Sequence, residues 1–321
     1  MRHGPCGGVR ADHSCEMAPV PCPFVVLDQA VAWTGPPLEE ETARWPGPQL
    51  RRPLIVTDLS VTPFSAGSVQ SVVGTLAGSC DGVLVPEHNN RPDFPPTLMT
   101  ALVREAGGDP WITLTCRDRN RVVLEQELAG LAHAGAAAVL TVTGDGRAQG
   151  VRPDVTQVFD IDSTTLAGLA AVAGLNVVVA ESPAAPPFAL RPLRLREKQR
   201  AGAGLCLLNH AGSTARVAEF ATAARAAGVD IGLIAGVAVY TDERGVAGLR
   251  LPGLTLDPEQ VDAVLSADDP VEAGIEAAVT EARGLLAVDG IVGVNLSGRG
   301  SYRSEPFAAE VKAEVGRRIR A

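Results

Sequence analysis

Residues 111–143 read WITLTCRDRNRVVLEQELAGLAHAGAAAVLTVT and contain two apolar runs separated by an alanine-rich and leucine-rich segment. The runs Trp111–Thr115 and Ala138–Thr143 lack the polar alternation of a half-exposed strand, so they are typical of strands buried on both faces of a parallel sheet. The segment between them, Val122–Ala134, is long enough for a crossover helix. The stretch therefore predicts one β/α unit.

The same unit recurs on both sides of this stretch. The other apolar runs are Leu54–Val61, Gly82–Val85, Asn176–Ala180, Gly204–Asn209, Asp230–Val237 and Ile291–Leu296, and further helical segments are Thr164–Gly174, Ala215–Gly228 and Pro270–Leu286. Eight such repeats close a barrel more naturally than they extend an open sheet. A doubly wound sheet is the alternative, but no glycine-rich dinucleotide fingerprint follows the first run. We expect an α/β protein with a (β/α)₈ TIM barrel.

The barrel is expected to occupy residues 54–300, with separate segments at both ends. Residues 1–33 form an arm that carries three of the six cysteines, and residues 34–53 combine prolines with an acidic run, as a linker does. Residues 301–321 are assigned as a C-terminal tail.

Charge and composition exclude several classes of function. The net charge of −9 and the absence of a long basic run disfavour nucleic-acid binding. No apolar stretch approaches the roughly 18 residues of a membrane span, and the first residues lack the apolar core of a signal peptide. Six cysteines in a long chain do not suggest a disulfide scaffold. We therefore expect a cytoplasmic protein with reduced thiols, no membrane contact and a small-molecule ligand.

In a TIM barrel the chemistry lies at the carboxyl ends of the strands. Polar residues gather there in this sequence, among them Asp58, Glu87, Asp145 and Asn209. Any strand end that meets water tends to be polar, but polar residues at several strand ends of one barrel favour a functional site. The clustered His and Cys ligands of a catalytic metal are lacking at these ends.

Two segments carry a resemblance to a known family. The run LTCRDRNR at residues 114–121, followed by VLTVTGD at residues 139–145, resembles the methylenetetrahydrofolate reductases. The resemblance continues through VFDIDS at residues 158–163 and LREKQRAGAG at residues 195–204, and it covers residues 54–300. It implies a barrel that reduces 5,10-methylenetetrahydrofolate to 5-methyltetrahydrofolate, with FAD relaying hydride from NAD(P)H and tetrahydrofolate as the one-carbon carrier.

The resemblance also implies roles for particular residues. Asp145 matches an aspartate between flavin and folate, Lys198 matches a lysine on the flavin phosphates, and Asn209 stands where the family has a folate-binding glutamine. Their structural alternatives are a helix N-cap for Asp145 and a solvated helix residue for Lys198. His210 is a further substrate-binding candidate, whose alternative is a structural hydrogen-bonding role. The segments near the cofactor add the candidates Thr115, Arg117, Asp118, Asn120, Thr143 and Gly144.

The sequence departs from the family at two points. The first strand lacks the glutamate that serves as catalytic acid, so we expect Asp58 to be the proton donor, with Glu87 as its rival. Strand alternation allows Asp58 to point into the barrel. The family's aspartate about one turn before the flavin-binding lysine is Arg191 here. Either FAD binds in an altered pocket, which we favour, or NAD(P)H reduces the folate directly.

The arm is similar to a zinc-binding module that accompanies some of these reductases. Cys6, Cys15 and Cys22, with His3 or His13, would complete a tetrahedral zinc site. The alternative is a remnant with free thiols. The arm could also dock a partner protein or a second copy of the chain.

The leading hypothesis is therefore a folate one-carbon oxidoreductase with Asp58 or Glu87 as acid and Asp145 orienting the pteridine. Two alternatives stay open. One is a folate-binding accessory subunit without reductase activity, and the other is a folate-dependent demethylating or methyl-transfer enzyme.

Overall fold

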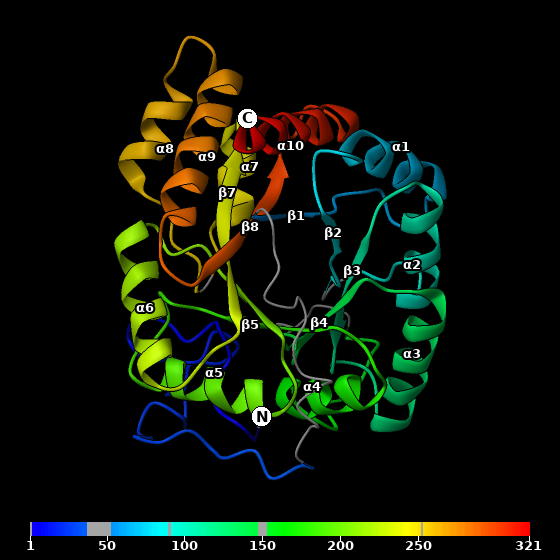
Figure 1. Cartoon of the computed structure of the whole chain (residues 1–321), viewed down its shortest axis with the longest axis vertical. Coiled ribbons are helices and arrows are strands. Elements are labelled where there is room, and N and C mark those ends of the chain that lie inside the picture. Colours follow the sequence, from blue (N-terminus) through cyan, green and yellow to red (C-terminus); the bar gives the residue numbers. More distant parts are fainter. Residues whose placement is uncertain (1, 37–52, 89–90, 147–152, 252) are drawn as a thin grey trace.

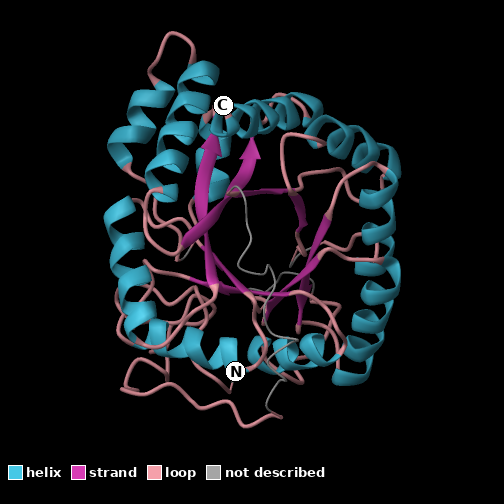
Figure 2. Ribbon diagram, in the orientation of Figure 1, coloured by secondary structure: helices cyan, strands magenta, loops and turns pink. Residues whose placement is uncertain are grey.

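The computed structural model describes residues 2–36, 53–88, 91–146, 153–251 and 253–321. Its eight strands form one closed parallel barrel in the order of the chain, which confirms the predicted fold (Figures 1 and 2). Strand β8 pairs with β1, with Val56 opposite Asn295, and this pairing closes the barrel. The strands are β1 (Leu54–Asp58), β2 (Gly82–Val85), β3 (Pro110–Thr115), β4 (Ala138–Val142), β5 (Val177–Glu181), β6 (Leu205–Leu208), β7 (Gly232–Tyr240) and β8 (Ile291–Gly300).

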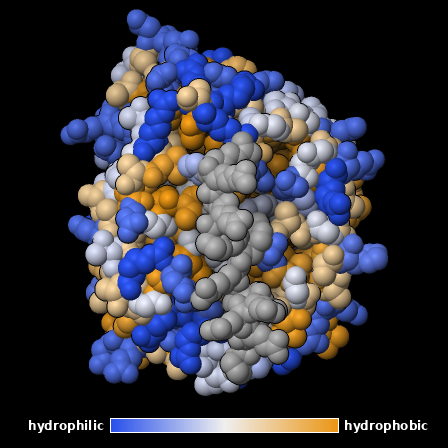
Figure 3. Space-filling model, viewed as in Figure 1, coloured by the Kyte–Doolittle hydropathy of each residue, from blue (hydrophilic) through white to orange (hydrophobic). Residues whose placement is uncertain are grey.

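A ring of helices surrounds the strands (Figure 2). These helices are α1 (Ala66–Leu76), α2 (Pro96–Glu105), α3 (Arg121–Ala134), α4 (Ser163–Val172), α5 (Leu190–Arg200), α6 (Thr214–Ala226), α7 (Glu243–Leu249), α8 (Pro258–Leu265), α9 (Pro270–Leu286) and α10 (Glu305–Arg320). On the face drawn in Figure 3, hydrophilic side chains cover much of the rim and hydrophobic ones gather nearer the middle. No described helix combines the length and the apolar character that crossing a bilayer requires.

Apolar side chains on both faces of the strands account for the uninterrupted runs in the sequence. Val56, Trp111 and Ile234 belong to a cluster inside the barrel. Their neighbours in sequence, such as Ile55 and Ile112, belong to the larger core between strands and helices. Alternate residues thus enter two different cores, and neither face of the sheet meets water.

The structure differs from the sequence prediction near the C-terminus. Residues 301–321, expected to be a tail, contain α10, whose buried residues include Val311 and Val315. This helix packs against α1, α9 and β8, so it completes the ring. Between β7 and β8 the chain also adds α7 and α8 before the expected helix α9.

The arm packs across α4 and α5. The side chain of Asp162, at the N-cap of α4, accepts hydrogen bonds from the backbone N–H groups of Arg2 at 2.8 Å and His3 at 2.9 Å. The His3 ring approaches the same carboxylate at 2.9 Å through Nδ1. At the other end of the arm, the backbone N–H of Trp33 donates to Glu197 on α5 at 2.8 Å. Most of the predicted linker, residues 37–52, lies outside the described residues.

Asp162 serves the helix and the arm with one carboxylate. Its oxygen also accepts from Thr165 N at 3.1 Å, the usual N-cap bond of a helix. Burial alone would raise the pKa of Asp162, but the hydrogen bonds from His3 and Arg2 hold it well below its usual range. The ionised carboxylate therefore fixes the arm on the barrel.

We predict that Asp162→Ala lowers the free energy of unfolding by about 2–4 kcal/mol, because it removes a cap and the charge-assisted bonds to the arm. Asp269→Ala is the matched control, since Asp269 caps α9 away from the arm and should cost only about 1 kcal/mol. Urea unfolding gives the energies, and trypsin cleavage at Arg10 reports release of the arm. Equal losses and equal cleavage in the two variants would show that the arm does not depend on Asp162.

Candidate functional site

A cavity of about 610 Å³ lies at the carboxyl ends of the strands. It is lined from β4 and the residues after it by Thr143, Gly144 and Asp145, and from the end of β6 by Asn209. Cys6–Gly8, Glu16 and Met17 of the arm line the same cavity. The arm is therefore part of the wall of the candidate site, a role that sequence analysis did not predict.

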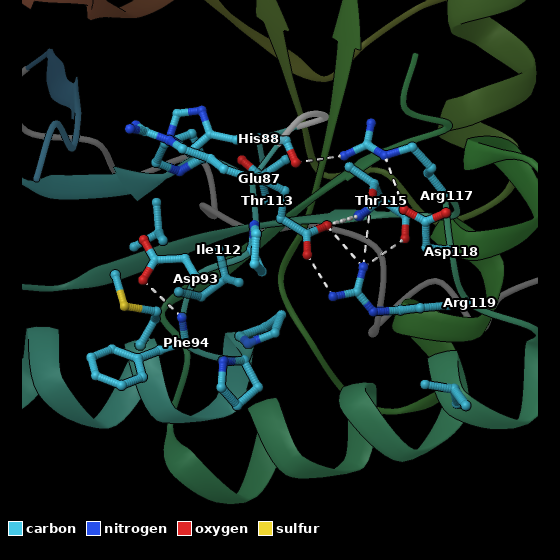
Figure 4. A pocket seen from close by; sticks show the side chains of 18 residues that line it. Glu87, His88, Asp93, Phe94, Ile112, Thr113, Thr115, Arg117, Asp118 and Arg119 are labelled. Carbon is cyan, nitrogen blue, oxygen red and sulfur yellow. Dashed lines mark hydrogen bonds and ion pairs between the residues drawn. The ribbon is translucent and has the colours of Figure 1, made fainter. Parts of the chain in front are cut away.

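A second cavity of about 360 Å³ adjoins the first, and Glu87, His88, Thr113, Thr115 and Arg117 line both (Figure 4). Its other walls include the apolar side chains of Phe94, Met99 and Val123 and the charged side chains of Arg91, Asp93, Asp118 and Arg119. Two neighbouring compartments with a shared wall could hold two parts of one ligand, or two small molecules side by side.

Glu87 forms an ion pair with Arg119 in the shared wall. One of its oxygens accepts from Arg119 Nη2, and the other accepts from the backbone N–H of Thr115 at 2.7 Å and from Arg119 Nη1 at 3.1 Å. Figure 4 shows the guanidinium facing the carboxylate. Both carboxylate oxygens of Glu87 are thus engaged by donors of the protein, which speaks against Glu87 as the proton donor that the sequence suggested.

Arg117 joins the loops that follow three strands. Its guanidinium donates to the carbonyl of His88 at 3.0 Å and to that of Asp145 at 3.1 Å. Gly144 has a φ of +82°, and a Cβ there would lie 3.1 Å from the Thr115 side chain and 3.2 Å from that of Arg117. A glycine is therefore required for the close approach that sets Asp145 at the cavity.

Asp145 lines the cavity with an exposed side chain. The N-cap of the next described helix, α4, is Asp162. The alternative interpretation of Asp145 as a helix cap therefore does not apply to α4.

Lys198 belongs to a buried cluster around Glu181, which ends β5. Glu181 is paired with Arg191 at 2.9 Å, Arg194 at 2.8 Å and Lys198 at 3.1 Å. Burial alone would raise the pKa of Glu181, but the three cations hold it well below its usual range. Burial and the charge of Arg194 lower the pKa of Lys198 to about 8, against the opposing effect of Glu181. Lys198 is therefore buried and ion-paired, not the solvated helix lysine that was its structural alternative.

Asn209 lines the cavity and donates through Nδ2 to Ser182 Oγ at 2.7 Å. His210 lines neither of the two cavities. It is buried, its Nδ1 lies 3.1 Å from the carbonyl of Thr255, and burial lowers its pKa. These contacts favour the structural alternative for His210.

Asp58 also lies outside the lining of both cavities. Its carboxylate accepts from Asn295 Nδ2 at 3.0 Å and from the backbone N–H of Gly298 at 3.1 Å, so it joins β1 to β8. The position of Asp58 therefore does not support its expected role as a proton donor in the cavity that Asp145 lines.

Two further cofactor candidates have local structural roles. Asn120 caps α3 by accepting from Val123 N at 3.0 Å, and it lines neither cavity. Asp118 lines only the smaller cavity, in a left-handed backbone conformation with a φ of 64° and 3.5 Å from Arg117 Nε.

The arm cysteines do not converge on a metal site. Within the described ranges, no three His, Cys, Asp or Glu side chains are grouped closely enough to hold a metal ion. The Cys6 thiol donates to Glu16 at 3.4 Å instead, and burial, with the nearby Glu16 charge, raises its pKa to about 12. Zinc requires thiolates, so the set Cys6, Cys15 and Cys22 is not assembled as the sequence suggested.

Sequence reasoning missed Arg194, which lines the larger cavity. A signal was present, because Arg191, Arg194 and Lys198 are spaced to lie on one face of a helix. In the structure that face lies against Glu181 at the end of β5.

Of the comparisons with known proteins, only the one with solved structures finds a match. No protein-family profile matches the sequence, so membership of the reductase family is not confirmed. No curated protein matches it either. An uncharacterised protein from Clostridium thermocellum, which binds two copies of 5-methyl-5,6,7,8-tetrahydrofolic acid, is similar in structure, with a TM-score of 0.61 and 10% identity over 84% of this chain and 96% of that one. A ligand-free tryptophan synthase from M. tuberculosis gives a TM-score of 0.46 and 15% identity over 84% of this chain and 94% of that one. At 10% identity, the likeness to the Clostridium thermocellum protein shows the barrel fold alone.

We predict that Glu181→Gln lowers the free energy of unfolding by about 3–5 kcal/mol, because three buried cations lose their counter-charge. Glu125→Gln is the control, since Glu125 forms an exposed pair with Arg121 on α3 and should change stability by less than about 0.5 kcal/mol. Guanidinium unfolding at pH 7 measures both. A loss below about 1 kcal/mol for Glu181→Gln would mean that the cluster is hydrated or uncharged.

Proposed function

We propose that the protein binds a reduced folate, with the pteridine ring in the larger cavity. The observation that carries this proposal is the Asp145 carboxylate, which lines the cavity together with the Asn209 amide. A pteridine offers an amino group and ring N–H groups as donors and a carbonyl as acceptor. A carboxylate and an amide supply the matching partners, and the carboxylate bonds are charge-assisted.

The remaining walls suit a flat ring of mixed polarity. Leu140, Val142 and Leu207 line the cavity with apolar side chains, while Thr113 and Thr141 add hydroxyl groups. Ligand sites typically combine such apolar walls with a few converging polar groups. The similar Clostridium thermocellum protein binds two copies of 5-methyl-5,6,7,8-tetrahydrofolic acid, and this supports the same ligand class here.

The larger cavity does not fit a flavin. Lys198 Nζ donates to the Ala180 carbonyl and to Glu181, so one of its three N–H groups remains for a ligand. Arg191, at the position of the family's aspartate, is fully buried against Glu181. No aromatic ring of Phe, Tyr or Trp is among the described residues that line the larger cavity, so a flavin ring would find no aromatic side chain to stack on. We therefore derive no step through FAD.

The reductase activity implied by the sequence resemblance is the narrower hypothesis, with hydride passing directly from NAD(P)H to the folate. Neither acid that the sequence suggested fits the role of proton donor, because both oxygens of Glu87 already accept hydrogen bonds from the protein and Asp58 lies outside both cavities. A second candidate function is methyl transfer to or from a folate. The adjoining cavity favours it, because a second small molecule there would lie beside the pteridine.

We predict that 5-methyltetrahydrofolate binds to the protein in isothermal titration calorimetry. Asp145→Ala should weaken binding by about 10- to 150-fold, which corresponds to the 1.5–3 kcal/mol of hydrogen bonds to a charged group. Asp230→Ala is the control, since Asp230 is exposed just before β7 at the opposite end of the barrel. Absence of binding heat with millimolar ligand, or equal weakening by both substitutions, would overturn the proposal.

We also predict that the purified protein shows no absorption band of oxidised flavin in the blue. The same preparation is then assayed for oxidation of NADH and NADPH with methylenetetrahydrofolate, with and without added FAD. A bound flavin, or turnover that depends on added FAD, would contradict our interpretation of the Lys198 region. Turnover without flavin would support the direct reductase.

A further inference from the structure

The larger cavity has an excess of buried positive charge in one wall. Arg194 and Lys198 of α5 line this cavity although only 5% and 2% of these residues are exposed. Together with Arg191 they surround Glu181, which among the described residues is the one carboxylate paired with all three of them. Three cations against one carboxylate leave two positive charges without a counter-charge inside the cluster. Uncompensated charges in a dry site are unfavourable, and they attract anions strongly.

Among these three cations, the two that line the cavity have N–H groups without a hydrogen-bond partner among the described residues. Arg191, which does not line it, donates to Glu181 and to the carbonyls of Ala185 and Pro186. Arg194 donates to Glu181 through Nη1, and its Nε has no partner in the described part of the chain. Lys198 donates to Ala180 and Glu181, which leaves one of its three N–H groups.

A hydroxyl group completes the donor set. Ser182 lines the cavity next to Glu181, and its Oγ accepts the hydrogen bond from Asn209 Nδ2. The Ser182 hydroxyl hydrogen is therefore available to a ligand. A guanidinium, an ammonium and a hydroxyl group are the donors that proteins use to bind carboxylates and phosphates.

The arm encloses this group of donors. A Cβ at Gly4 would lie 2.8 Å from Cδ of Arg194, so only glycine allows the arm to pack this closely over that side chain. Exclusion of water lowers the local dielectric constant and strengthens any ion pair formed there.

We propose that Arg194, Lys198 and Ser182 form a subsite for an oxyanion, either a carboxylate or a phosphate group, in the larger cavity. If the anion is the carboxylate tail of the folate, this subsite rests on the proposed function and names a further part of the folate that the cavity binds. The same chemistry would hold a separate small anion beside the pteridine. Asp145 and the Arg194–Lys198 pair would then recognise groups of opposite character in one cavity.

The test compares ligands with and without the anionic group. Calorimetry is carried out with 5-methyltetrahydrofolate, with 5-methyltetrahydropterin, which lacks the glutamyl tail, and with succinate and inorganic phosphate. Arg194→Gln and Lys198→Met remove the charges, and Ser182→Ala removes one donor without changing the ionic cluster. Arg196→Gln is the matched control, because Arg196 lies on the same helix with 43% of its side chain exposed and pairs with Glu197.

If the glutamyl tail is the anion, Arg194→Gln and Lys198→Met should weaken the binding of 5-methyltetrahydrofolate by about 10- to 150-fold. Ser182→Ala should weaken it by about 2- to 10-fold. Binding of the pterin should stay unchanged, as should all binding to Arg196→Gln. If the anion is separate, succinate or phosphate binds to the wild type and loses affinity in the same variants. Either pattern supports the subsite.

The subsite proposal would be overturned if Ser182→Ala and the folded charge variants bound the folate and both anions as tightly as the wild type does. Thermal unfolding shows whether Arg194→Gln and Lys198→Met fold, and Lys198→Arg, which keeps the charge, should keep anion binding. Should the wild type bind an anion through these residues but bind no folate, the proposed function fails while the subsite stands.

Discussion

Glu181 is a carboxylate buried at the end of β5, and its charge has to be balanced inside the protein. Arg191, Arg194 and Lys198 provide this balance from one face of α5, so a single acid fixes the helix against the strand. The arrangement also determines the character of the larger cavity, because two of the three cations line it. The electrostatics of the candidate site thus follow from the same ion pairs that join α5 to the end of β5.

The arm depends on the same region. Its first residues are held by Asp162, its last by Glu197, and Gly4 packs on Arg194 between them. An arm fixed at both ends can contribute a wall of a cavity, as Cys6–Gly8 do. The sequence suggested a separate metal module, whereas the contacts of the described arm with Asp162, Arg194 and Glu197 attach it to the barrel.

Local patterns were sufficient for the barrel and for part of the site. Apolar runs identified each strand, and the rule that strand ends converge placed Asp145 and Asn209 at one cavity. The same rule does not say which neighbour a side chain will meet. Asp58 is bound by Asn295 and Gly298, residues far away in the sequence, and this long-range pairing excludes it from the cavity. The sequence analysis missed helix α10. Strand β8 continues past its apolar run to Gly300, and the buried residues of α10 that follow it are interspersed with charged ones.

The pairing of acids in the cavity bears on which folate chemistry is feasible. A carboxyl group donates a proton near neutral pH when burial favours its neutral form and no cation opposes this. Three cations hold the pKa of Glu181 well below its usual range, and both oxygens of Glu87 already accept hydrogen bonds from the protein. Asp145 is exposed and is suited to accept hydrogen bonds from a donor-rich ring. Under the proposed function, these three acids would therefore recognise and orient the folate, whereas Glu16 lines the same cavity and has its pKa raised by burial, as a proton donor there would need.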